Sequence, residues 1–70
     1  MRPQPLEIVN VPGALLNRAT VEVVCGRQKS TINRDIKAKT FPPPHRQSAR
    51  ASHWLSDHIR AWIAGTWRAT

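Results

Sequence analysis

The chain lacks most of the residues that build disulfides and metal sites. It has a single cysteine, Cys25, so it can form no internal disulfide. His45, His53 and His58 do not share a ligand spacing, and no cysteine pair accompanies them. We therefore expect no metal, and we interpret Cys25 as a small buried apolar residue.

Signatures of catalysis and of membrane insertion are missing as well. The sequence has no phosphate-binding glycine loop and no paired carboxylates, and the adjacent Ser56, Asp57 and His58 would point in different directions on a helix. We therefore expect no catalytic residues, no enzymatic activity and no cofactor. No apolar run near the N-terminus is long enough for a signal peptide or a spanning helix. A cytoplasmic protein with no membrane partner is expected.

Positive charge, by contrast, is abundant and clustered. The formal net charge is +7 and the pI is about 11.5, with only four acidic residues. Residues 1–26 sum to zero, residues 27–50 sum to +6, and the remainder adds +1. This distribution favours a polyanionic partner that contacts the middle of the chain.

Seventy residues make one domain. Residues 1–14 are dense in proline and are predicted to form a flexible N-terminal arm that could add a strand. Residues 15–64 are predicted to form the folded domain, and residues 65–70 a C-terminal tail. Trp67, in this tail, could cover the edge of the core or meet a partner.

The first helix is predicted over residues 18–25. Asn17 is a good N-cap and Gly26 a good stop. The β-branched residues of 20–25 favour a strand by propensity alone. The spacing of Val21, Val24 and Cys25 on one face instead favours the helix.

A second helix is predicted over residues 29–39, before the prolines at 42–44. Ile32 and Ile36 form its narrow apolar stripe, and Asp35 lies on the far flank. At helical spacing the opposite face carries four polar residues, with two more at its edge. The four are Ser30, Thr31, Arg34 and Lys37, and the two are Lys29 and Asn33.

The rest of the domain is predicted to be a β-hairpin and a last helix. Residues 45–54 have extended flanks and a tip of small residues. Ser56 is predicted to cap a helix that runs to Ala64 and turns one apolar face inward. The fold class is therefore a small, mostly helical α+β domain. Its predicted core is Leu16, Val21, Val24, Ile32, Ile36, Phe41, Trp54, Ile59 and Trp62, with Leu55 and Ile63 on the same face of the last helix.

Two helices joined by a glycine-containing turn suggest a helix-turn-helix, whose second helix enters the major groove of DNA. The candidate DNA contacts on this helix are Gln28, Lys29, Ser30, Thr31, Asn33, Arg34 and Lys37. Basic side chains can bind guanine or phosphate, Asn33 adenine, and the Thr31 methyl group thymine. A hairpin wing could reach the minor groove or phosphates. Its candidate contacts are Arg46, Gln47, Ser48 and Arg50. The alternative is a solvated basic helix and loop with no partner.

Over residues 15–64 the pattern resembles AlpA-type phage regulators, which are small winged helix-turn-helix proteins akin to excisionases and to the MerR-like DNA-binding fold. The first half of the match is Leu15-Leu16, Val21, Gly26, Lys29-Ser30-Thr31-Ile32, Arg34, Ile36-Lys37, Phe41-Pro42 and Pro44. The second half is Ser48-Ala49-Arg50-Ala51, Trp54 and Ile59-Arg60-Ala61-Trp62-Ile63. Gln28 stands where the family usually has a serine or aspartate cap, and Arg27 replaces an apolar turn residue.

The resemblance implies a sequence-specific regulator or recombination directionality factor (excisionase) of a prophage or integrative element. The implied partners are double-stranded DNA, an integrase or RNA polymerase, and further copies of the chain bound cooperatively on DNA. A nucleoid-associated location follows from DNA binding. The rival interpretation is a protein-interaction module, similar to an antirepressor, that uses the basic face without specific DNA binding.

Overall fold

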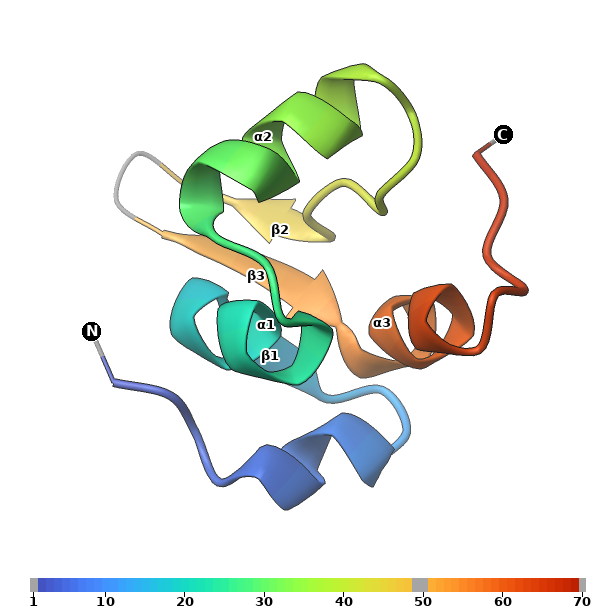
Figure 1. The fold of residues 1–70 in the computed structure, drawn as a ribbon. Helices are drawn as coiled ribbons and strands as arrows, with labels where there is room; N and C mark the ends of the chain where they lie inside the picture. The colour runs from blue at the N-terminus through green and yellow to red at the C-terminus, as the bar shows by residue number, and fades with distance from the viewer. Residues whose placement is uncertain (1, 49–50, 70) are drawn as a thin grey trace.

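The described residues form a three-stranded antiparallel sheet, three α-helices and a short 3-10 helix (Figure 1). The structure, a computed structural model, describes residues 2–48 and 51–69. The elements are η1 (Leu6–Asn10, a 3-10 helix), β1 (Leu15–Asn17), α1 (Arg18–Cys25), α2 (Lys29–Lys37), β2 (Arg46–Gln47), β3 (Ser52–Leu55) and α3 (Ser56–Ile63). The predicted class, a small α+β domain, is confirmed.

One apolar core joins the sheet to the helices. Its buried members are Leu16, Val21, Cys25, Ile32, Phe41, Trp54 and Ile59, and Ile8, Val9, Val24, Ile36 and Trp62 pack against them. All nine predicted core residues are in this set, and Cys25 is buried as expected. The inward placement of Ile63 was wrong, because 53% of this residue is exposed.

Helix α1 is defined by the residues at its two ends. The Asn17 side-chain oxygen accepts from the Thr20 backbone N–H at 2.8 Å, which caps the first turn. Gly26 ends the helix in the left-handed region with φ 66°. Val21 and Cys25 then point into the core. The helix is therefore confirmed over the strand, because burial of one face outweighs the β-propensity of its residues.

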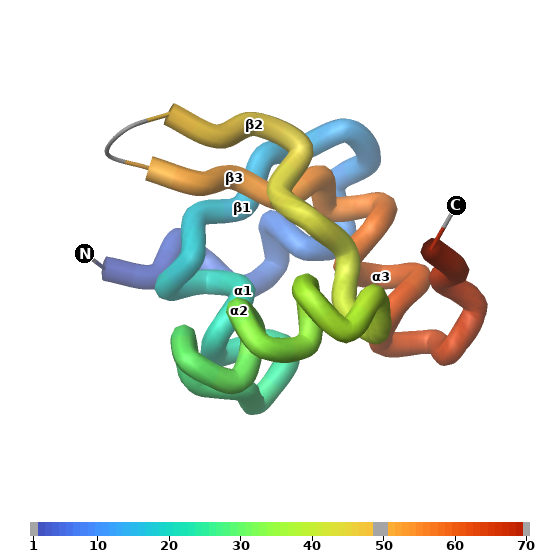
Figure 2. Tube along the Cα trace, turned by 90° about the horizontal axis from the view of Figure 1, so that it is seen from above, coloured from blue at the N-terminus to red at the C-terminus, as the bar shows by residue number. Residues whose placement is uncertain are grey.

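Strand β3 is the centre of the sheet. It pairs with β1, with Leu16 opposite Trp54, and with β2, with Gln47 opposite Ser52. The predicted hairpin between β2 and β3 forms, and β1 joins it as a third strand. Helices α1 and α2 lie on one side of this sheet (Figures 1 and 2).

The N-terminal segment corrects the prediction of a flexible arm or an added strand. Residues 6–10 form η1, which packs against α3 and α1. The Ile8 N–H donates to the Pro5 carbonyl and the Val11 N–H to the Ile8 carbonyl, each at 3.0 Å. Proline has no backbone N–H to donate, but Pro5 and Pro12 stand at the edges of these turns, where no donor is needed. The dense prolines therefore do not prevent local helical structure.

The side chain of Gln4 takes the place of a neighbouring strand at the free edge of β1. The Asn17 backbone N–H donates to Gln4 Oε1 at 2.8 Å, and Gln4 Nε2 donates to the Leu15 carbonyl at 3.2 Å. The amide thus satisfies one donor and one acceptor of the edge, which would otherwise be open to another strand. The N-terminal segment is tied to the sheet at this point.

The start of α3 also differs from the prediction. Leu55 is the N-cap and makes no side-chain cap, whereas Ser56 is the first helical residue and is fully buried. Ser56 Oγ donates to the Val11 carbonyl at 2.6 Å and accepts from the Ala14 N–H at 3.2 Å. The hydroxyl satisfies polar groups of the N-terminal segment instead of its own helix, in hydrogen bonds that are partly buried.

Candidate nucleic-acid interface

Helix α2 buries one narrow side and exposes the rest. Ile32 is fully buried and Ile36 is half-buried, as their spacing predicted. Of the predicted contacts, Thr31 is half-buried and the others on or beside the helix are exposed: Gln28, Lys29, Ser30, Asn33, Arg34 and Lys37. The helix ends at Lys37, two residues before the predicted end. The structure therefore brings this predicted set together on one helix.

The N-terminal end of α2 has no side-chain cap. Gln28 occupies the N-cap position, and its side chain makes no capping hydrogen bond. The first backbone N–H groups of a helix have no partner within the helix, and together they attract anions. The absence of a side-chain cap at Gln28 therefore leaves this end suited to a phosphate oxygen.

Asp35 is the one acid on α2, and it neutralises the exposed face only weakly. Its carboxylate lies 4.0 Å from Nε of Arg34, and the two side chains are 25% and 77% exposed respectively. Exposed ion pairs of this kind contribute little. Arg34 and Lys37 lie in the last turn, where they also complement the helix dipole.

Arg18 is a functional candidate that the sequence did not indicate. Its Nη1 donates to Oδ1 of Asn33 at 3.3 Å, and its guanidinium lies 5.3 Å from the ring centroid of Trp54. One end of the Asn33 amide is therefore oriented by a residue of α1. The charge count concealed Arg18, because the acids of residues 1–26 balance its charge.

The segment that joins α2 to β2 is fixed by two indole groups. Trp62 Nε1 donates to the Thr40 carbonyl at 2.9 Å, and Trp54 Nε1 donates to the Pro42 carbonyl at 2.8 Å. The Phe41 and Trp62 rings meet edge to face with centroids 4.9 Å apart. These contacts fix the position of β2 relative to α2.

The structure describes three of the four predicted hairpin contacts. Arg46 and Gln47 lie on β2 and are exposed. Ser48 is exposed as well and helps to close the turn, since its N–H donates to the Ala51 carbonyl at 2.8 Å. Arg50 lies outside the described residues. Figure 2 shows α2 lying over α1, with the joining segment running from the end of α2 to β2 at the edge of the sheet.

Lys39 is a further base that the sequence reasoning left out of the site. It is exposed and adopts φ 63°, the one left-handed conformation of a non-glycine residue in the described chain. The N–H groups of Lys39 and Thr40 donate to the carbonyls of Ile36 and Asp35 at 3.1 and 2.9 Å. This pattern is a Schellman motif, in which glycine is the usual residue at the left-handed position.

Cys25 is the one cysteine of the chain, and it is buried. Burial raises the pKa of the Cys25 thiol to about 11, and nearby Arg27 lowers it by a smaller amount. Cys25 is therefore a neutral thiol at physiological pH. Among residues 2–48 and 51–69, no three His, Cys, Asp or Glu side chains gather where they could hold a metal ion.

The chain matches no protein-family model, no curated protein and no solved structure. In the described part of the chain, no helix combines the length and the apolarity needed to span a bilayer.

Proposed function

We propose that the protein is a sequence-specific binder of double-stranded DNA with a winged helix-turn-helix. In this proposal α1 and α2 form the helix-turn-helix, α2 enters the major groove, and the β2–β3 hairpin acts as the wing. The geometry required is a short helix with its outer face and N-terminal end accessible. The exposed polar face of α2 and its uncapped start meet that requirement.

One observation carries the proposal. Helix α2 and strand β2 both carry exposed bases, and the segment between them is held by hydrogen bonds from two tryptophans. A solvated basic helix with no partner would not need a fixed relation to a second basic element. A duplex does need it, because base contacts and backbone contacts lie at set distances from each other.

Roles for individual residues follow from their chemistry. Arg34 and Lys29 are proposed to bind guanine or phosphate, and Ser30 to bind a phosphate at the helix start. Asn33 is proposed to meet a base with its orientation fixed by Arg18. Arg46 and Gln47 are proposed to contact the backbone or the minor groove. No enzymatic step and no cofactor are part of this proposal.

The biological role is proposed from the AlpA-type resemblance. It is that of a transcriptional regulator or excisionase of a prophage or integrative element, acting in the cytoplasm on the nucleoid. Both roles use the same helix and wing, so they share the same DNA contacts. Footprinting across an attachment site and the neighbouring promoter separates them.

Selection of duplexes from a random library tests the proposed function. The intact protein should enrich a short common sequence, and the Arg34→Ala variant should relax the preference at one or two positions. Arg2→Ala removes the same charge from an exposed residue outside α2 and β2, and it should leave the preference unchanged.

Two results would contradict specific binding. One is equal recovery of all duplexes by the intact protein. The other is the absence of any retarded duplex at about 100 mM salt, which would favour the protein-interaction module instead.

A further inference from the structure

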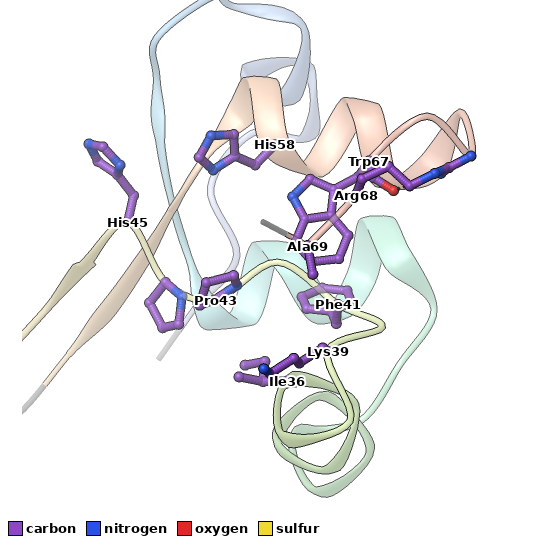
Figure 3. A pocket seen from close by; sticks show the side chains of 10 residues that line it. Ile36, Lys39, Phe41, Pro43, His45, His58, Trp67, Arg68 and Ala69 are labelled. Carbon is purple, nitrogen blue, oxygen red and sulfur yellow. Dashed lines mark hydrogen bonds between the residues drawn. The ribbon is translucent and has the colours of Figure 1, made fainter.

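A groove lies beside the segment that joins α2 to β2, on the flank next to α3 (Figure 3). It has a volume of about 680 Å³, within the size range of sites that hold a ligand. Its walls come from three parts of the chain that are distant in sequence. These are the end of α2 with the proline segment, α3, and the C-terminal tail, where Trp67 lies over Phe41.

The residues that line the groove are of two kinds only. The apolar ones are Ile36, Phe41, Pro43, Pro44, Trp67 and Ala69, and the polar ones are Lys39, His45, His58 and Arg68. All four polar residues are basic, and none is an acid or a neutral hydrogen-bonding side chain. The groove thus combines a large apolar floor with two cationic side chains and two imidazoles, and its chemical complement is an apolar group next to anions.

The backbone of the proline segment offers little to a ligand. Pro43 and Pro44 have no N–H group, and the carbonyls of Thr40 and Pro42 already accept from the two tryptophan indoles. A peptide here could not be held by strand pairing, because the donors for a ladder are missing. Side-chain contacts would have to supply the binding energy.

The rim groups are placed to meet an extended ligand. His45 and His58 have ring centroids 6.1 Å apart at one end. At the other end, Arg68 donates through Nη1 to the carbonyls of Gly65 and Trp67, which holds its guanidinium beside Trp67. Lys39 and Arg68 are the cationic side chains that line the groove, and the two imidazoles add hydrogen-bonding groups.

A DNA duplex does not fit this surface. Double-stranded DNA is read by convex elements that enter its grooves, such as a helix. The concave floor between Trp67 and Pro43 has the opposite shape. The groove is therefore distinct from the α2 face, although both are basic.

We propose that this groove is a docking site for an acidic peptide segment of another protein. The segment inserts one large apolar side chain between Trp67 and the proline segment, and its aspartate or glutamate residues pair with the basic rim. Trp67 is the central contact, since half-buried aromatic residues in pockets dominate the energetics of such interfaces. The site is independent of the proposed DNA contacts and does not use them.

A random peptide library displayed on phage, captured by the full chain, tests the proposal. The selected peptides should carry one large apolar residue flanked by acids. Replacing those acids by their amides, or the apolar anchor by alanine, should each lower the affinity about tenfold. In the protein, Trp67→Ala should do the same, and His45→Ala should weaken binding by a smaller factor. Ile63→Ala removes an exposed apolar side chain outside the groove and should change nothing.

The three tryptophan indole signals in nitrogen–proton correlation spectra provide a second readout. The selected peptide should shift the Trp67 signal and leave that of fully buried Trp54 in place. Three outcomes would overturn the proposal. They are a selection that enriches no acidic peptide, a Trp67 signal that responds to duplex DNA instead of peptide, and a self-association of the chain that Trp67→Ala abolishes. The last would make a second copy the occupant.

Discussion

Helices α2 and α3 are nearly equal in length and end in the same hydrogen-bond pattern, yet their surroundings are opposite. Helix α3 packs against η1, β3 and α1, and its polar residues bind the N-terminal segment. Arg60, for example, pairs with Asp57 and donates to the Val9 carbonyl at 3.2 Å. Helix α2 packs against α1 and leaves its polar residues exposed.

The stability of the fold should therefore depend on the polar residues of α3 more than on those of α2. In α3 the polar groups hydrogen-bond the N-terminal segment and tie it to the fold, so changing them should cost stability. In α2 the polar groups satisfy no such partners in the described chain, so changing them should affect binding alone. Variants at matched positions in the two helices test this difference.

The largest effect on stability is expected from the isoleucines. Ile59 of α3 is fully buried, whereas Ile36 of α2 is half-buried. Ile59→Ala should lower the unfolding free energy by about 2–5 kcal/mol, because it removes apolar contacts and leaves a cavity. Ile36→Ala should lower the unfolding free energy by about half as much, since a half-buried side chain buries less apolar area on folding. Urea unfolding measures both, and equal costs would contradict the comparison.

The serines at the starts of the two helices should differ as well. Ser56→Ala removes the partner of the Val11 carbonyl and the Ala14 N–H, and should cost about 1–3 kcal/mol. Ser30→Ala alters an exposed residue and should stay within about 0.5 kcal/mol. Thermal and urea unfolding of the two variants test this. If Ser30→Ala lowered the unfolding free energy as much as Ser56→Ala, the polar residues of α2 would also support the fold, which would contradict the comparison.

The smallest effects are expected at the two helix ends. Gly65 has φ 77° after α3, and Lys39 has φ 63° at the corresponding position after α2. Lys39→Gly should stabilise the protein by about 1 kcal/mol, because the left-handed conformation is strained for a side chain. Gly65→Ala should destabilise the protein by about the same amount. The cost should come from the left-handed backbone conformation alone, since an added Cβ would meet no atom within 4 Å. The two substitutions should change the unfolding free energy in opposite directions. Changes in the same direction would contradict the strain inferred at Lys39.

Local signals in the sequence were enough to predict much of the fold. Asn17 and Gly26 delimit α1 because each acts within one turn of its own position. The spacing of Ile32 and Ile36 correctly gave the buried side of α2. Of the four candidates on the opposite face, Thr31 is half-buried and the other three are exposed. The prolines at 42–44 indicated that the helix ends before them, but it ends at Lys37, two residues earlier than predicted.

Features that depend on long-range partners could not be predicted. Ser56 looks like a cap in sequence, but its hydroxyl binds a segment about 45 residues away. The role of Gln4 at the edge of β1 and the contact of Arg18 with Asn33 arise only after folding. The conformation of Lys39 carried no signal either, because a lysine does not mark a left-handed turn as glycine does.

The most direct test of the central claim, that the exposed face of α2 contacts DNA, is the affinity for one selected duplex over a range of salt concentrations. It should be measured for the intact protein, Arg34→Ala and Arg2→Ala. Arg34→Ala should lose about 1–3 kcal/mol of binding free energy if Arg34 reads a base. If it binds only phosphate, affinity should fall equally for all sequences and the salt slope should become shallower. Arg2→Ala should remain close to the intact protein. Equal losses in the two variants would mean that net charge alone holds the DNA, and would contradict the claim.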